Sequence, residues 1–89
     1  MAQVTLELTN RLGLHARAAA KFVHTAASFS SQVLVRNNDE EVNGKSILGL
    51  LLLAAPFGAQ LTVLAEGSDA DAALRAIGEL ISDRFGEGE

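Results

Sequence analysis

Two side chains near the N-terminus have the types and the spacing that phosphoryl chemistry needs: His15 and Arg17, within the segment RLGLHARAAA. A neutral imidazole is a competent nucleophile, and a guanidinium offers a permanent charge and a fork of donors that fits an oxyanion. The alanine-rich stretch that follows predicts a helix over residues 16–27. We therefore expect a histidine at the entrance of a helix, with an arginine close to it.

The first turn of that helix supplies the other half of the expected site. The amides of Ala16, Arg17 and Ala18 have no acceptor within a helix that starts there, and the helix dipole adds a partial positive charge. Such a terminus binds phosphate readily and disfavours a protonated imidazole. Because residues two apart do not share a helix face, His15 must lie outside the helix and fold over its end, which Gly13 facilitates. The alternative is a histidine that only caps the helix, beside a solvated arginine.

Composition and charge exclude several other kinds of protein. A length of 89 residues fits one domain over residues 1–89, and the absence of cysteine excludes disulfides and thiolate chemistry. A net charge of −4 with scattered bases argues against nucleic acid as a direct partner. The longest apolar run, residues 47–56, is about half of a membrane span, and an alternating pattern stands where a signal peptide would. We expect a cytoplasmic monomer without metal, cofactor or membrane insertion.

The elements that must position His15 follow from hydrophobic periodicity and turn residues. Strands are expected at residues 4–8, 33–35, 40–43 and 61–65, and helices at 16–27, at 47–55, and after a cap at Ser68 and Asp69 with the core stripe Leu74, Ile77, Ile81 and Phe85. The order β-α-β-β-α-β-α predicts an α+β fold, an open-faced β-sandwich whose four-stranded antiparallel sheet has three helices on one face. Residues 86–89 are expected to form a frayed tail.

The second histidine, His24, is not expected to act together with the first. Each residue turns a helix by about 100°, which places His24 on the side opposite His15. The two side chains therefore cannot form a metal pair or a catalytic dyad, and we expect His24 at the surface.

The segment NGKSILGLLLLAA predicts a helix with more apolar surface than one sheet can bury. Ser46 is a good N-cap and Pro56 a plausible terminator. One stripe, Leu50, Leu53 and Ala54, can face the sheet, and the second comprises Leu48, Leu51, Leu52 and Ala55. Either neighbouring helices cover the second stripe, as we expect for Leu52, or it forms an exposed docking patch.

The two motifs LGLHARAAA and NGKSILGLLLLAA, at their separation in this chain, resemble the HPr family. Its members are the histidine-containing phosphocarriers of the bacterial phosphoenolpyruvate-dependent phosphotransferase system. The resemblance implies a carrier rather than an enzyme. His15 would accept a phosphoryl group on a ring nitrogen from enzyme I, with phosphoenolpyruvate as ultimate donor, and pass it to an enzyme IIA domain. Arg17 would steady the phosphoryl group.

The resemblance also implies regulation and docking. In many HPr proteins the serine that matches Ser46 is phosphorylated by HPr kinase/phosphorylase, and the positions that match Ile47, Leu48 and Leu51 contact enzyme I and the IIA domains. One departure is Ala18, where the family usually has proline. Alanine is well tolerated in a first helical turn, so the chemistry is retained.

Two other functions remain open from the sequence. The first is a regulatory carrier of the nitrogen-related branch of the same family, although the intact Gly44-Lys45-Ser46 favours the sugar-system type. The second is a regulatory domain of similar fold that binds an anion at His15 without covalent chemistry. Formation of an acid-labile adduct with enzyme I and phosphoenolpyruvate would separate a carrier from such a binding domain.

Overall fold

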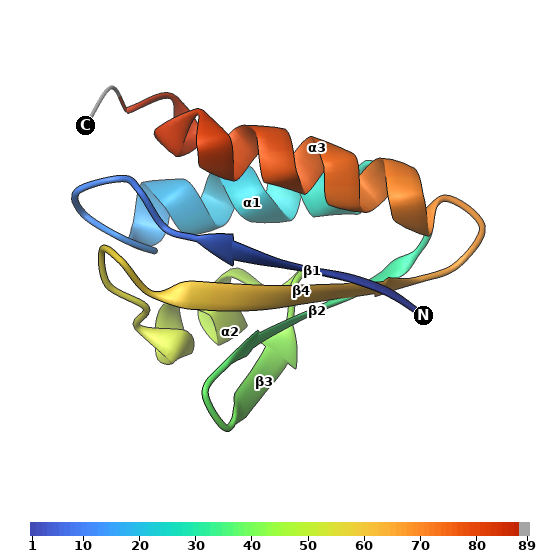
Figure 1. Cartoon of the computed structure of the whole chain (residues 1–89), viewed down its shortest axis with the longest axis horizontal. Coiled ribbons are helices and arrows are strands. Elements are labelled where there is room, and N and C mark those ends of the chain that lie inside the picture. The colour runs from blue at the N-terminus through green and yellow to red at the C-terminus, as the bar shows by residue number, and fades with distance from the viewer. Residues whose placement is uncertain (88–89) are drawn as a thin grey trace.

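The computed structural model describes residues 1–87, which form the predicted elements in the predicted order. The strands are β1 (Ala2–Glu7), β2 (Gln32–Asn37), β3 (Glu40–Asn43) and β4 (Gln60–Glu66), and the helices are α1 (Ala16–Ala27), α2 (Ile47–Leu53) and α3 (Ala70–Ser82). A short 3₁₀ turn, η1 (Arg84–Gly86), follows α3. The chain thus runs from a strand at one edge of the sheet to a turn beyond the last helix (Figure 1).

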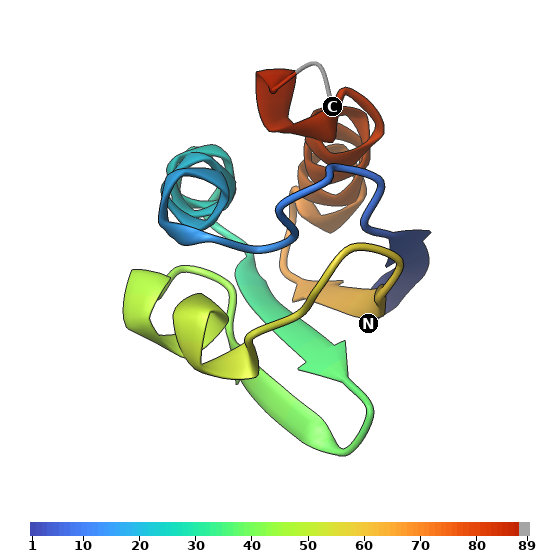
Figure 2. The ribbon, with the colours of Figure 1, turned by 90° about the vertical axis from the view of Figure 1, so that its left-hand side faces the viewer.

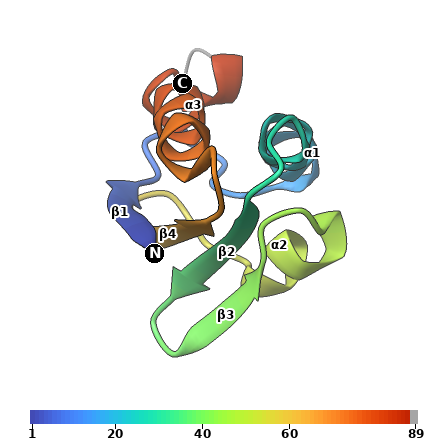
Figure 3. The ribbon, with the colours of Figure 1, turned by 90° about the vertical axis from the view of Figure 1, so that its right-hand side faces the viewer.

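One antiparallel sheet in the order β1-β4-β2-β3 forms the base of the molecule. Val4, Val63 and Val35 lie in register across three of its strands, and the last two are fully buried. On the opposite face, Thr5 pairs with Thr62, and their hydroxyls are 3.2 Å apart in an exposed hydrogen bond. The three helices cover the valine face and leave the other open (Figures 2 and 3). The predicted open-faced α+β fold is confirmed.

The core lies between this sheet and the apolar stripes of the helices. The fully buried residues of α1 are Ala18, Ala19, Phe22 and Ala26, and those of α3 are Ala73, Ile77 and Ile81. The small alanines allow α1 and α3 to lie side by side above the sheet (Figure 3). This packing fixes the axis of α1, and with it the place of His15 at the start of the helix.

Helix α2 is shorter than predicted. We expected it to extend to residue 55, before Pro56, but it ends at Leu53. Ala54 adopts the left-handed conformation, with φ 50°, and its N–H donates to the carbonyl of Leu51 at 3.0 Å. A left-handed residue at this position closes a helix and turns the chain away, so the proline is not what ends it.

The prediction that Ser68 and Asp69 cap α3 is correct for the position of Asp69 but wrong for the contacts of its side chain. Asp69 occupies the N-cap position, but its carboxylate makes no capping hydrogen bond. It instead accepts hydrogen bonds from the amides of Ser30 and Ser31, both at 2.9 Å, and from both serine hydroxyls. The carboxylate therefore joins the start of α3 to the loop between α1 and β2.

We expect Ser31→Ala to lower the free energy of unfolding by about 1–2 kcal/mol at neutral pH, because a buried hydroxyl that donates to a charged group is lost. The Ser31 hydroxyl and the Ser30 amide lower the pKa of Asp69 to about 2, against opposing desolvation. The cluster therefore stabilises the fold fully above pH 4, and this contribution declines as pH falls toward about 2. The difference between wild type and variant should shrink over the same range.

Urea unfolding from neutral to acid pH measures this difference. Ser30→Ala is the matched control, since its hydroxyl lies on the same carboxylate in an exposed contact at 3.3 Å and should contribute less. Equal stability of Ser31→Ala and wild type at neutral pH would contradict the assignment.

Candidate functional site

His15 is the N-cap residue of α1, with an extended backbone at φ −85° and ψ −178°. The first hydrogen bond of the helix runs from the amide of Ala19 to the carbonyl of His15 at 2.8 Å, so the amides of residues 16–18 open the helix. The imidazole makes no capping hydrogen bond. The His15 side chain therefore does not cap α1, and it is 26% exposed.

The loop before His15 is held against the segment that follows α2. Gly13 has φ +68°, and a Cβ built on it would lie 2.6 Å from the carbonyl oxygen of Ala55 and 2.9 Å from the Cα of Pro56. The next amide, that of Leu14, donates to the same Ala55 oxygen at 2.9 Å. Only glycine fits both the left-handed backbone and this close approach. The loop thereby places His15 beside α2.

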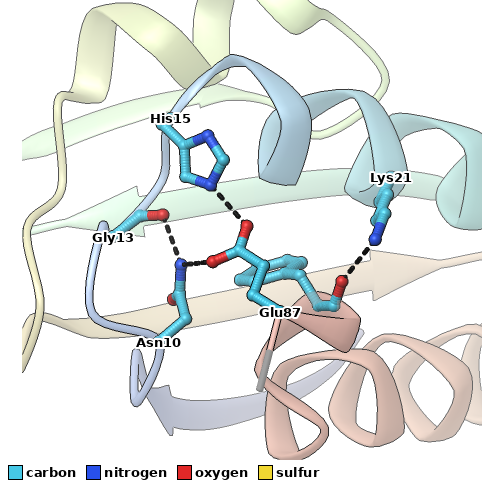
Figure 4. A network of polar contacts seen from close by, with 6 residues as sticks. Asn10, Gly13, His15, Lys21 and Glu87 are labelled. Atoms are coloured by element: carbon cyan, nitrogen blue, oxygen red, sulfur yellow. Dashed lines mark hydrogen bonds and ion pairs between the residues drawn. The ribbon is translucent and has the colours of Figure 1, made fainter. Parts of the chain in front are cut away.

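A carboxylate from the other end of the chain meets the imidazole. The Nε2 atom of His15 is hydrogen-bonded to Oε2 of Glu87, and Oε1 of Glu87 accepts from Nδ2 of Asn10 at 3.0 Å (Figure 4). Asn10, which is fully buried, also donates from Nδ2 to the carbonyl of Gly13 at 2.7 Å. The Glu87 side chain is only 10% exposed. Sequence reasoning missed both Asn10 and Glu87.

We expected a frayed tail over residues 86–89; Gly86 and Glu87 make hydrogen bonds to the rest of the chain, and residues 88–89 lie outside the described part of it. Phe85 is almost fully buried with a left-handed backbone, φ 55°, and the Lys21 ammonium donates to its carbonyl at 2.6 Å. The apolar Phe85 so close to the C-terminus was the signal in the sequence, because a frayed segment has no reason to contribute a buried aromatic side chain. Because Phe85 is anchored in the core, Glu87 lies next to the start of α1.

Arg17 lies on the same side of the site as Glu87. A hollow of about 440 Å³ is lined by Arg11, Leu12, Arg17, Gly86 and Glu87. Burial acts to raise the pKa of Glu87, but hydrogen bonds from Asn10 and His15 and the charges of His15 and Arg17 outweigh it and lower that pKa. Exposed Arg17 thus places a positive charge near Glu87, the residue that is hydrogen-bonded to His15.

The two ring nitrogens of His15 differ in their surroundings. Nε2 faces a carboxylate, which can only accept hydrogen bonds when ionised, so the proton of a neutral ring belongs on Nε2. Among the described residues, none hydrogen-bonds to Nδ1, which lies on the side of the ring away from Glu87 (Figure 4). In that tautomer the free lone pair of the ring lies on Nδ1.

Ser46 is the N-cap of α2, as the sequence predicts, and its Oγ accepts from the amide of Gly49 at 3.0 Å. The ammonium of the neighbouring Lys45 donates to the carbonyl of Phe29 at 2.8 Å. The Lys45 ammonium is thus held at the end of α1. Ser46 is only partly exposed, and its hydroxyl is engaged as a cap.

Helix α2 exposes a continuous apolar surface, here called the α2 patch: Ile47, Leu48, Leu51 and Leu52. Leu48 and Leu52 are each 68% exposed, so the expectation that neighbouring helices cover Leu52 is wrong. The buried side of this short helix is that of Leu50 and Leu53, where it meets the core, α1 and β3. Figure 2 shows α2 directly beside the end of α1 that begins at His15. An exposed apolar surface therefore lies near the start of α1.

His24 is exposed in the last turn of α1, as predicted, and is not brought to His15. Within residues 1–87, no group of three or more potential metal ligands lies close enough together to hold a metal ion. No helix in that part of the chain has the length and apolarity needed to cross a membrane. The described chemistry of the site is thus that of an imidazole, a guanidinium, helix amides and a carboxylate.

Comparison with known proteins agrees with this site. Residues 2–83 match the family model described as the PTS HPr component phosphorylation site. The phosphocarrier protein HPr of Neisseria meningitidis serogroup A is 49% identical over 89 residues, all of both chains. The phosphocarrier protein NPr of Shewanella violacea is 42% identical over 85 residues, which cover 96% of this chain and 91% of NPr.

A solved structure agrees as well. The crystal structure of HPr-C-His from Thermoanaerobacter tengcongensis superposes with a TM-score of 0.95, at 46% identity and 98% coverage of both chains. The likeness therefore extends over the whole fold, beyond the two motifs.

Proposed function

We propose that this chain carries a phosphoryl group on His15. The chain belongs to the HPr family of phosphocarrier proteins of the phosphotransferase system. Phosphorylated enzyme I is the donor, phosphoenolpyruvate the ultimate source, and an enzyme IIA domain the acceptor. The observation that carries the proposal is the geometry of His15: a partly exposed N-cap residue whose ring makes no capping bond and keeps Nδ1 free of the described residues.

In this proposal each group has one task. The Nδ1 lone pair of His15 attacks phosphorus, and the amides of Ala16 and Arg17 lie at the positive end of the helix dipole. The Arg17 guanidinium faces the developing negative charge. The carrier acts as a monomer and without a cofactor in this proposal. The chain is a relay and not a catalyst, since it leaves one partner covalently modified and meets another. It works in the cytoplasm, with its ultimate donor.

Reconstitution tests the proposal. Purified enzyme I, labelled phosphoenolpyruvate, the chain and an enzyme IIA domain are mixed, and label is followed on each protein. We expect acid-labile label on the chain first and on the IIA domain afterwards, with no label on the IIA domain when the chain is omitted. A chain that binds phosphate but takes no covalent label would support the non-covalent anion-binding domain instead.

The nitrogen-related branch is the second candidate, and the 42% identity to an NPr protein favours it as the alternative. The same assay separates the branches when the sugar-system enzyme I and its nitrogen-branch counterpart are offered in parallel. Preferential labelling by the sugar-system donor is expected.

The α2 patch is proposed as the docking surface for enzyme I and the IIA domain, and Ile47, Leu48 and Leu51 as its contact residues. Its support is exposure of these side chains beside the helix that begins at His15. Phosphorylation of Ser46 by HPr kinase/phosphorylase is proposed as a negative signal there. A phosphoryl group at this N-cap would be favoured by the helix terminus, but it would place negative charge next to the patch.

Negative charge on the α2 patch should weaken docking. We expect Leu48→Glu, and to a smaller extent Ser46→Asp, to raise the KM for transfer from phosphorylated enzyme I by about tenfold, because a charge must be desolvated in an apolar interface. Transfer kinetics over a range of chain concentrations measure the change.

The controls for that prediction are Leu48→Met, which keeps the patch apolar, and Ser46→Ala, which adds no charge. Leu48 is exposed, so the Glu variant should unfold at the same denaturant concentration as wild type. A KM for Leu48→Glu equal to that of Leu48→Met would remove the patch from the docking surface.

A further inference from the structure

Glu87 lies outside the residues that the family model matches, which end at residue 83. It nevertheless hydrogen-bonds to Nε2 of the His15 imidazole. We propose that Glu87 is a positioning residue: its carboxylate holds the proton of the neutral His15 ring on Nε2 and so keeps the Nδ1 lone pair ready for the phosphoryl group. This inference rests on the proposed function, and it assigns the residue that orients the nucleophile.

The position of Glu87 is built by the fold rather than by the tail alone. Phe85 is buried in the core, and the carbonyl of Phe85 accepts from Lys21 of α1 at 2.6 Å. The amide of Glu87 donates to the carbonyl of Arg84 at 3.0 Å, which closes the η1 turn. These contacts fix the backbone before the carboxylate reaches the ring, so little freedom remains for Glu87 to lose on binding His15.

Asn10 fixes which kind of atom the side chain of residue 87 must present to it. One hydrogen of its Nδ2 goes to the carbonyl of Gly13 at 2.7 Å, and the other goes to Oε1 of Glu87 at 3.0 Å. The Gly13 carbonyl can only accept, so the Asn10 amide cannot flip without bringing two oxygens together. Asn10 therefore presents a donor to residue 87 at all times, and residue 87 must present an acceptor to Asn10.

The same carboxylate suits the phosphorylated ring. In the transfer step the Nδ1 lone pair forms the N–P bond, the bond between phosphorus and the donor's leaving atom breaks, and its electron pair stays with the donor. The proton on Nε2 stays in place, so the ring carries a positive charge as the N–P bond forms. Glu87 opposes that charge from the side of the ring away from phosphorus. This resembles the role of a carboxylate that orients and supports a catalytic imidazole.

Replacing Glu87 with glutamine tests whether the carboxylate sets the tautomer of His15 or only contacts its ring. Asn10 must receive the Gln oxygen, so the Gln amide N–H₂ faces Nε2 of His15. A donor there forces the proton of a neutral ring onto Nδ1, which hides the nucleophilic lone pair. Glu87→Ala removes the partner without imposing a tautomer. The glutamine variant should therefore be worse than the alanine variant, the reverse of the order expected from loss of contact alone.

Two readouts on ¹⁵N-histidine-labelled protein test the inference. Long-range ¹H–¹⁵N spectra at alkaline pH should show the proton of the neutral His15 ring on Nε2 in wild type and on Nδ1 in Glu87→Gln. In Glu87→Ala they should show a mixture of the two tautomers. The rate of phosphorylation by enzyme I should fall by about tenfold or more in Glu87→Gln relative to Glu87→Ala. Glu79→Gln, at an exposed position on α3, is the charge-matched control and should behave as wild type.

A Glu87→Gln protein that keeps the Nε2 proton would overturn the inference, and so would one that switches tautomer but is phosphorylated at the rate of the Glu79→Gln control. Failure of the proposed function is a different result: wild type would then take no label from enzyme I, while the spectra would still report whether Glu87 sets the tautomer.

Discussion

Replacement of His15 with alanine should abolish acid-labile labelling of the chain by enzyme I and phosphoenolpyruvate, to below about 1% of the wild-type rate. Among the described groups at the start of α1, the imidazole is the one whose phosphoryl adduct is acid-labile, since amides and protonated guanidinium groups are poor nucleophiles and the Glu87 carboxylate would give an acyl phosphate instead. Removing the nucleophile leaves binding without transfer. Quench-flow labelling followed by gel separation measures the rate.

His24→Ala is the matched control for that loss, because it removes the other imidazole from the exposed far end of the same helix. It should be labelled like wild type. Because the His15 side chain is partly exposed and makes no capping bond, His15→Ala should remain folded. Label retained by His15→Ala and lost by His24→Ala would reverse the assignment.

Replacement of Arg17 with alanine should lower the rate of phosphorylation by about 100-fold, the usual cost of removing one donor from a site that stabilises a transition-state oxyanion. Arg17 is exposed on the first turn of α1 and lines the hollow beside Glu87, so its removal costs little packing. Arg17→Lys should recover part of the rate, since lysine keeps the charge but lacks the fork of donors. Single-turnover transfer from phosphorylated enzyme I gives these rates.

Arg75→Ala, on the exposed side of α3, controls for loss of one positive charge far from the site. The rate of that variant should match wild type. An Arg17→Ala rate within twofold of the Arg75→Ala rate would show that Arg17 is the solvated surface charge of the alternative interpretation.

Much of this fold could be predicted because its determinants are local. Alternating residues in β1 and β4 and the 3.6-residue period of α1 place their apolar side chains on one face whatever the tertiary partners are. The start of α1 at Ala16 follows from the alanine-rich run after Gly13, which also places His15 outside the helix. The position of residues 15–17 at the start of α1 could therefore be predicted from the sequence.

The rest of the site depends on contacts between segments far apart in the chain. Glu87 meets His15 only because Phe85 is drawn into the core and Lys21 binds its carbonyl. Asp69 has the residue type of a helix cap, yet serines of another loop satisfy its carboxylate. In both cases local propensity gave a reasonable role for the residue, and a tertiary partner offered a better one.

The missed exposure of Leu52 has a different cause. Hydrophobicity predicts burial when a neighbouring element is available, and the sequence does not say that α2 ends two residues early and has the core on one side only. An apolar side chain left uncovered in this way is the usual mark of an interface. The error in predicting Leu52 thus supports the proposed role of the α2 patch.

The most direct test of phosphoryl transfer to His15 is ³¹P and ¹⁵N spectroscopy of ¹⁵N-histidine-labelled chain after incubation with enzyme I and phosphoenolpyruvate. We expect one phosphoryl group, bonded through Nδ1 of His15, with a P–N coupling to that nitrogen and none at His24. Phosphorus bonded to Nε2, to another residue, or to no part of the chain would contradict this expectation.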